Sequence, residues 1–261
     1  MAALEEYSSE EFNAVLAQII TDRLGSGGIT SSIAPCAVLL GGQSGAGKTT
    51  LHPIFRKKFG GNVIVINGDE YRSFHPRYRE LDQQYGPEAV AYTAPWAGKM
   101  TEALIDELSR RGYNLIIEGT LRTYDVPMKT ATLLKERGYN VSLALMAVKP
   151  EISLVSCLIR YESMRIAGTI PRATDPAHHQ KIIQEIVGNL QHLESTGVFD
   201  AVRLFSRAKQ CLYPVKDDAR MASEALRDVL FGEWTPEEMH HYENLQKQLE
   251  ELKTQQSFRL P

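Results

Sequence analysis

Short apolar runs alternate along the chain with longer segments in which apolar residues recur every three or four positions. The short runs are rich in Val, Ile and Leu, and they predict buried strands at residues 36–41, 62–67, 114–118, 141–148 and 202–206. The longer segments predict helices at residues 47–59, 88–111, 127–137, 150–166 and 175–196. Because strands that alternate with helices form parallel sheets, the pattern predicts an α/β fold with a central, mostly parallel sheet flanked by helices.

Two further helices are predicted near the ends of the chain, over residues 8–24 and 235–254. Each begins with a capping box, formed by Ser8 with Glu11 and by Thr235 with Glu238. The apolar positions of the second helix are Met239, Tyr242, Leu245, Leu249 and Leu252. These positions cover too few heptads to indicate a coiled coil, so we expect the helix to dock on its own domain rather than on a partner.

Composition narrows the class of protein. Of 261 residues, 43% are hydrophobic and 23% charged, and no linker divides them, so we expect a single domain over residues 1–261 with its core at about 33–234. The net charge of −3 provides no basic field to attract nucleic acid. Three widely separated cysteines and an N-terminus without a signal-peptide pattern indicate a cytoplasmic protein that contacts no membrane.

A glycine-rich segment, Gly42–Thr49, matches the P-loop pattern G-x-x-x-x-G-K-[ST]. An apolar strand is predicted immediately before this segment and a helix immediately after it, which is the context that a P-loop requires. Its glycines allow backbone N–H groups to surround a phosphate, and the N-terminus of the following helix adds a favourable dipole. The expected nucleotide-binding residues are Gly42, Gln43, Ser44, Gly45, Ala46, Gly47, Lys48, Thr49 and Thr50.

Two P-loop side chains have specific expected roles. Lys48 is expected to contact the β- and γ-phosphates of ATP, and the Thr49 hydroxyl to bind Mg²⁺ that arrives with the nucleotide. A P-loop alone does not distinguish ATPases, GTPases and kinases. The type of reaction must therefore be inferred from the polar residues that follow the other predicted strands.

Asp69 lies in a polar segment just after the second predicted strand. At this place a carboxylate can face the γ-phosphate, so Asp69 is the candidate base that deprotonates an acceptor hydroxyl. The alternative is that Asp69 only caps the next helix.

Glu118 and Arg122 follow the third predicted strand. Glu118 can hold a metal-bound water or an acceptor hydroxyl, and Arg122 an anionic substrate group. A purely structural role for Glu118 is the alternative.

A group of arginines, Arg160, Arg165 and Arg172, surrounds a glycine-bearing loop at Gly168. Such a group suits a mobile helical lid over phosphates, although arginines on a solvated helix face give the same pattern. The adjacent His178 and His179 point to different sides of a predicted helix, which argues against a paired metal site. His52 and His75 are left without a role.

Taken in order, these motifs resemble the zeta toxins of epsilon/zeta toxin–antitoxin systems, and most closely their Pez-type branch. The resemblance covers about residues 12–234 and rests on segments 39–49, 68–76, 97–102, 117–127, 159–162 and 171–174. It implies a P-loop kinase fold and an enzyme that uses ATP and Mg²⁺ to phosphorylate the 3′-hydroxyl of UDP-N-acetylglucosamine. Such an enzyme deprives bacterial cell-wall synthesis of its precursor.

The resemblance also implies roles for individual residues. Lys48, Asp69, Arg160 and Arg172 are the implied catalytic residues. The implied UDP-sugar pocket is lined by Glu102, Glu118, Thr120, Arg122 and Thr130. A small helical antitoxin protein that occupies the ATP site is the implied partner.

Three alternatives remain open at this point. The same motifs would serve a kinase of another small hydroxylated metabolite or of an antibiotic. A regulatory GTPase is less favoured because the chain has no N-K-x-D segment. A scaffold that binds partners through its terminal helices is the least favoured, because it leaves Lys48 and Thr49 without a purpose.

Overall fold

A computed structural model describes residues 4–25, 27–169, 173–217 and 219–257. It contains a six-stranded sheet with the strand order β2-β3-β1-β4-β5-β6. The strands are β1 (Cys36–Gly41), β2 (Ile64–Asn67), β3 (Leu115–Glu118), β4 (Asn140–Met146), β5 (Ala201–Phe205) and β6 (Cys211–Tyr213). Pairs β2–β3 and β4–β5 are parallel, whereas β6 runs antiparallel to β5. The predicted mostly parallel α/β sheet is therefore confirmed.

Helices account for most of the remaining described residues. The α-helices are α1 (Ser9–Gly25), α2 (His52–Lys58), α3 (Gly68–Tyr71), α4 (Tyr78–Tyr85), α5 (Ala89–Arg110), α6 (Asp125–Glu136), α7 (Pro150–Ile166), α8 (Pro176–Thr196), α9 (Ala222–Phe231) and α10 (Pro236–Ser257). Short 3₁₀ helices cover η1 (Lys48–Leu51), η2 (Arg72–Phe74) and η3 (Gly86–Glu88). In the described part of the chain, no helix combines the length and apolar character needed to cross a membrane.

Both predicted capping boxes are formed. The Ser8 N–H donates to Glu11 Oε2 at 2.7 Å while the Glu11 N–H donates to Ser8 Oγ at 3.1 Å. Thr235 and Glu238 make the same reciprocal pair, at 2.9 and 3.2 Å. Two N–H groups that have no partner within each helix are thereby satisfied, which fixes where α1 and α10 begin.

Strand β6 and helices α4 and α9 are among the elements that were not predicted. Strand β6 has three residues and helix α4 has eight, so each is too short for its pattern of apolar residues to be diagnostic. Helix α9 follows Met221, whose N–H donates to the Glu224 carboxylate of the first turn at 2.9 Å. The Glu194 carboxylate of α8 also accepts hydrogen bonds from the N–H groups of Ala222 and Ser223, at 2.6 and 2.9 Å. This second cap comes from a distant part of the sequence, so the local pattern does not contain it.

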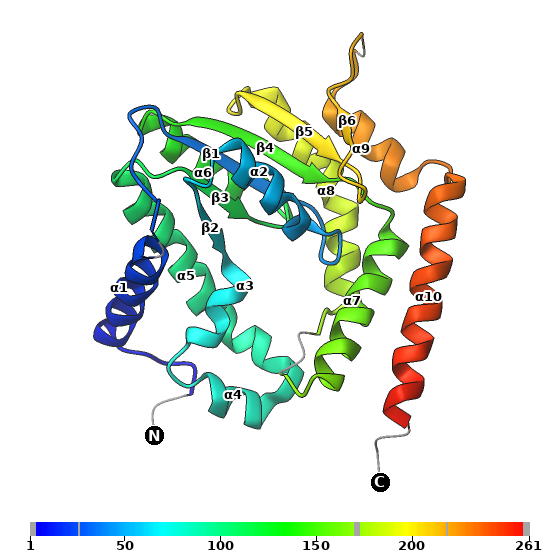
Figure 1. Cartoon of the computed structure of the whole chain (residues 1–261), viewed down its shortest axis with the longest axis horizontal. Helices are drawn as coiled ribbons and strands as arrows, with labels where there is room; N and C mark the ends of the chain where they lie inside the picture. The colour runs from blue at the N-terminus through cyan, green and yellow to red at the C-terminus, as the bar shows by residue number, and fades with distance from the viewer. Residues whose placement is uncertain (1–3, 26, 170–172, 218, 258–261) are drawn as a thin grey trace. The chain divides into compact units, whose positions relative to one another are not determined.

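The chain divides into two compact units. Unit 1 comprises Met1–Val38, His52–Gly119 and Leu133–Asn140, and unit 2 comprises Leu39–Leu51, Thr120–Thr132 and Val141–Pro261. In unit 1, helix α1 lies alongside α5 (Figure 1). Their contact is an aromatic cluster in which the buried Trp96 meets Phe12, Tyr7 and His75 at ring-centroid distances of 4.7 to 5.3 Å. His75 is thus part of the core of this unit.

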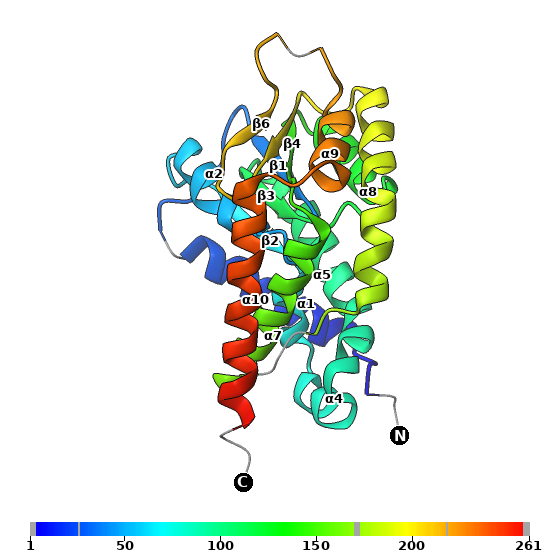
Figure 2. The same ribbon diagram turned by 90° about the vertical axis from the view of Figure 1, so that its right-hand side faces the viewer.

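In unit 2, the C-terminal helix α10 packs along α7, as both ribbon views show (Figure 2). Leu245 and Leu249 of α10 are buried. The segment that leads into α10 is held by Lys149, whose buried ammonium group donates to the carbonyls of Gly232 and Glu233 at 2.7 and 3.2 Å. The expectation that this helix docks on its own chain is confirmed.

Candidate active site

The P-loop follows β1 directly and belongs to unit 2. Gly42 and Gly45 have φ angles of 133° and 77°, which residues with a side chain rarely adopt. A Cβ atom at position 45 would also lie 2.0 Å from the Ser153 carbonyl oxygen of α7. Glycine at this position therefore permits both the backbone turn and the close packing of the loop on α7.

The element after the P-loop differs from its prediction. A single helix was expected over residues 47–59, but the chain forms the 3₁₀ turn η1 first and begins α2 at His52. The Thr50 N–H bonds to the Gly47 carbonyl at 2.9 Å, which is the i to i−3 spacing of a 3₁₀ turn. Pro53 explains the change, because proline is accommodated in the first turn of an α-helix and not farther inside it.

The side chain of Lys48 folds back onto the P-loop. Its Nζ donates to the carbonyl oxygens of Gly42 at 2.8 Å and Gln43 at 3.2 Å. The Thr49 side chain is exposed, so its hydroxyl is accessible to a metal ion bound with a nucleotide. Among the described residues, no group of three or more His, Cys, Asp or Glu side chains is placed to hold a metal by itself.

Contacts with the segment after β4 and with α8 brace the P-loop. The Gln43 side chain is fully buried, and its Nε2 donates to the Val148 carbonyl beyond β4 at 2.8 Å. Helix α8 contributes the buried His179, whose Nε2 lies 2.9 Å from Ser153 Oγ of α7. Burial lowers the pKa of His179, and a hydrogen bond to the Ser44 backbone opposes that effect. His179 thus ties the P-loop to α7 and α8.

We expect the stability of the protein to fall as the pH drops below 6.5. The folded state holds the pKa of His179 below its ordinary value of 6.5, so the unfolded state takes up a proton first and gains stability as the solution becomes more acidic. His75 and His241 act in the same direction, since burial is the main cause that lowers the pKa of each. Thermal unfolding measured from pH 7.5 to 5.5 should give a falling Tm.

The variant His179→Gln should show a smaller fall in Tm over this pH range. His178→Gln is the matched control, because His178 is the exposed neighbour on the same helix and should leave the fall in Tm nearly unchanged. Equal pH dependence of Tm in the His179→Gln protein and the unaltered protein would contradict the assignment.

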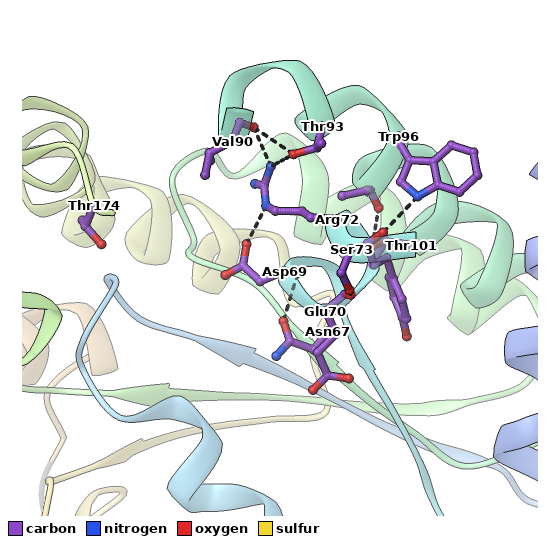
Figure 3. A network of polar contacts seen from close by, with 12 residues as sticks. Asn67, Asp69, Glu70, Arg72, Ser73, Val90, Thr93, Trp96, Thr101 and Thr174 are labelled. Atoms are coloured by element: carbon purple, nitrogen blue, oxygen red, sulfur yellow. Dashed lines mark hydrogen bonds and ion pairs between the residues drawn. The ribbon is translucent and has the colours of Figure 1, made fainter. Parts of the chain in front are cut away.

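Asp69 lies on the short helix α3 of unit 1, directly after β2 (Figure 3). The cap of this helix is Asn67, whose side chain accepts the Asp69 N–H at 3.2 Å, so the interpretation of Asp69 as a helix cap is wrong. The Asp69 side chain is 59% exposed, and its Oδ1 accepts from Arg72 Nε at 3.2 Å. Arg72 also donates to the Val90 carbonyl of α5 at 2.7 Å, which fixes the guanidinium beside the carboxylate.

Helix α5 packs against α3. Trp96 Nε1 donates to the Tyr71 carbonyl at 2.9 Å, and both side chains are buried. A Cβ atom at Gly68 would lie 2.9 Å from the Thr101 hydroxyl, so glycine allows α3 to approach α5 here. Glu102 follows Thr101 on α5 and is exposed. The start of α3 and the exposed Asp69 are therefore held by rigid, buried neighbours.

Glu118 is the last residue of β3 and pairs in register with Asn67 of β2. Its side chain is 8% exposed, and Oε1 lies 2.5 Å from Nε2 of His52, the first residue of α2. The contact is an ion-pair approach without hydrogen-bond alignment. The sequence did not predict this role for His52. A contact of this kind is also what we would expect if Glu118 had the purely structural role named above as the alternative.

The segment after β3 contains three more predicted pocket residues, and all belong to unit 2. Thr120 and Thr130 are half-buried, whereas the Arg122 side chain is exposed. Asn189 of α8 donates to the carbonyls of Leu121 and Arg122 at 3.0 and 2.8 Å. Leu121 has a φ of 56°, an unusual value for leucine, and the two hydrogen bonds from Asn189 hold it there.

The predicted lid arginines have different surroundings. Arg160 of α7 is half-buried, and its Nη2 donates to Thr174 Oγ1 at 3.4 Å. Its Nε is buried without a hydrogen-bond partner in the described part of the chain, which leaves a donor available to a ligand. Arg165 is exposed and pairs with Glu162. Arg172 lies outside the described residues.

Comparison with known proteins decides the family. The family model for zeta toxin matches residues 21–218 of this chain. The chain belongs to the zeta toxin family. It is 47% identical to toxin PezT of Streptococcus pneumoniae over 250 residues, which cover 95% of this chain and 98% of that toxin. It is 42% identical to toxin zeta of Streptococcus pyogenes over 180 residues, which cover 69% of this chain and 63% of that toxin.

Solved structures extend the zeta toxin comparison to the fold. One from the PezAT chromosomal toxin–antitoxin system of Streptococcus pneumoniae aligns with a TM-score of 0.87 at 44% identity. The alignment covers 97% of this chain and all of that one. A structure of AvrRxo1-ORF1:-ORF2 with ATP aligns with a TM-score of 0.52 at 17% identity over 94% of this chain and 79% of that one, which shows a shared fold alone. The predicted kinase-like P-loop fold and the predicted family are thus confirmed.

Proposed function

We propose that the chain is a toxin kinase that transfers the γ-phosphate of ATP to the 3′-hydroxyl of UDP-N-acetylglucosamine and so blocks bacterial cell-wall synthesis. The observation that carries the proposal is the P-loop of a zeta toxin chain, with the Lys48 ammonium lying across it. A P-loop lysine in this position turns toward the phosphates when they enter the loop. The sugar nucleotide as acceptor rests on the family resemblance.

The proposed catalytic roles follow from the chemistry of each side chain. Lys48 neutralises the β- and γ-phosphates, and Asp69, exposed after β2, accepts the proton of the sugar hydroxyl. Arg160, with its unpartnered buried Nε, stabilises charge on the transferring phosphoryl group. We propose the same charge-stabilising role for Arg172, on the basis of the sequence alone. Thr49 holds Mg²⁺, which neutralises phosphate charge when it is bound with the nucleotide.

The acceptor pocket that the family resemblance implies comprises Glu102, Glu118, Thr120, Arg122 and Thr130. Carboxylates accept hydrogen bonds from sugar hydroxyls, and the exposed Arg122 supplies the cation that a diphosphate needs. In this proposal the His52 contact holds the Glu118 carboxylate in place rather than removing it from the site.

We also propose that a small helical antitoxin protein inhibits the kinase by occupying the ATP site. The support is the toxin–antitoxin context of the pneumococcal relative and the exposure of Thr49 beside the P-loop. A cytoplasmic location and a single kinase domain that contains both units stay predictions. The same holds for the absence of nucleic-acid and membrane contacts.

A panel of acceptors tests the choice of substrate. We expect label from γ-labelled ATP to appear on UDP-N-acetylglucosamine, with far slower transfer to UDP-glucose, free N-acetylglucosamine or an aminoglycoside antibiotic. Preferred transfer to the antibiotic or to the free sugar would favour the alternative, a kinase of another hydroxylated molecule. GTP hydrolysis that needs no acceptor would favour a regulatory switch instead.

A further inference from the structure

Arg207 lies in the turn after β5, far from the P-loop in sequence, yet it contacts the P-loop directly. Its Nη1 donates a hydrogen bond to the Gly45 carbonyl oxygen at 2.9 Å. Both residues belong to unit 2. Gly45 is the position where the loop packs closest against α7, so Arg207 and α7 hold the same peptide from different sides.

The charge of Arg207 has no acidic partner in the described part of the chain. No Asp or Glu of that part forms an ion pair with it. Burial lowers the pKa of its guanidinium, and the nearby Cys157 opposes that effect. The pKa of His241 on α10 is lowered by burial and then by the charge of Arg207. A half-buried cation without a carboxylate partner is costly unless an anion compensates it.

A short series of contacts connects Arg207 to Lys48. The peptide between Gly45 and Ala46 is held at both ends, because Arg207 binds its carbonyl and the Gln43 carbonyl accepts its N–H at 3.2 Å. The same Gln43 carbonyl accepts from Lys48 Nζ at 3.2 Å. A change in the orientation of this one peptide would therefore move the turn at residues 43–46 and the contacts of the phosphate-binding lysine together.

We propose that Arg207 is a positioning residue that holds the turn at residues 43–46 in its phosphate-binding shape, and that bound phosphate compensates its charge. The proposal rests on the nucleotide site proposed above. It assigns Arg207 to the phosphate part of the ligand, not to the base or ribose.

Two variants and a control test this proposal. Arg207→Met keeps the length of the side chain and removes the charge and the hydrogen bond, whereas Arg207→Lys keeps the charge. Arg203→Met is the matched control, because Arg203 lies on the neighbouring strand β5 and has no contact with the P-loop. The dissociation constants of ATP–Mg²⁺ and of inorganic tripolyphosphate are measured by calorimetry, together with the Tm of each ligand-free protein.

We expect Arg207→Met to bind both ligands about ten- to a hundredfold more weakly, because a hydrogen bond to a charged group is lost at the loop. Arg207→Lys should recover part of this loss, and Arg203→Met should bind like the unaltered protein. The Tm of the ligand-free Arg207→Met protein should be unchanged or higher, because an uncompensated charge has been removed.

Three results would overturn the proposal. The first is unchanged affinity of Arg207→Met for ATP, and the second is a lower Tm with unchanged affinity, which would mean a structural brace only. The third is weaker ATP binding with unchanged tripolyphosphate binding, which would place Arg207 at the base or ribose. Failure of the unaltered protein to bind either ligand would refute the nucleotide site itself, and with it the Arg207 proposal.

Discussion

Replacing Asp69 by Asn should lower kcat for phosphate transfer by about 10²- to 10⁴-fold, the usual contribution of a general base, while ATP affinity stays within about twofold. The substitution is nearly isosteric. The Asn side-chain oxygen can still accept from Arg72 Nε, which Asp69 Oδ1 does now at 3.2 Å, so the network in Figure 3 should persist. The helix cap is provided by Asn67, so α3 should also keep its start. Only the capacity to accept the proton is removed.

Glu70→Gln is the matched control for this substitution. Glu70 is the next residue of the same helix, is exposed, and forms an ion pair with Arg23 at 2.8 Å that should contribute little to stability. Its variant should transfer phosphate at the normal rate. Rates and ATP dissociation constants are measured for both variants and the unaltered protein. Full transfer activity in Asp69→Asn would remove Asp69 from the role of base and weaken the proposed mechanism as a whole.

Replacing Lys48 by Met should lower kcat by about 10²- to 10³-fold, as expected when a charge that stabilises the transition state is removed. ATP affinity should fall as well, because the ammonium group contacts phosphates both before and during transfer. The ligand-free fold should tolerate the change. The contacts from Nζ to the carbonyls of Gly42 and Gln43 lie within one loop that Arg207 and α7 also hold.

Lys57→Met provides the control for a lost positive charge. Lys57 is an exposed residue of α2, the helix that follows the P-loop, and its removal changes the net charge by the same amount. It should bind ATP and transfer phosphate normally. Calorimetry gives affinity, steady-state kinetics give kcat, and the Tm verifies folding. If Lys48→Met and Lys57→Met behaved alike, Lys48 would have no specific role at the phosphates.

Much of the fold could be predicted because its main elements are encoded locally. The strands β1 to β5 are short apolar runs, and the two capping boxes mark the beginnings of α1 and α10 within four residues of sequence. The exceptions are elements whose ends are set from elsewhere. Helix α9 is capped by Glu194 of α8, and no rule about neighbouring residues contains that contact. Pro53 is a local signal for the start of α2, but the prediction of a single helix over residues 47–59 did not take it into account.

The sequence predicted which residues form the candidate site, but not which residues they contact. Patterns identified the P-loop, Asp69 and Glu118 because each lies at the end of a strand or directly after it, where ligands bind in parallel sheets. They did not show that Asn67 caps α3 in place of Asp69, or that His52 approaches Glu118. Nor did they identify Arg207, although its place directly after the last parallel strand was the one signal that could have done so.

The product of the reaction tests the central claim most directly. The unaltered protein is incubated with ATP, Mg²⁺ and UDP-N-acetylglucosamine, with Asp69→Asn as the inactive control. Mass spectrometry then detects any phosphorylated sugar nucleotide, and phosphorus-coupled NMR assigns the position of the phosphate. We predict a single new phosphoryl group on the 3′-hydroxyl of the sugar, formed by the unaltered protein and scarcely by the variant. Unmodified UDP-N-acetylglucosamine after ATP turnover, or a phosphate at another position, would contradict the account.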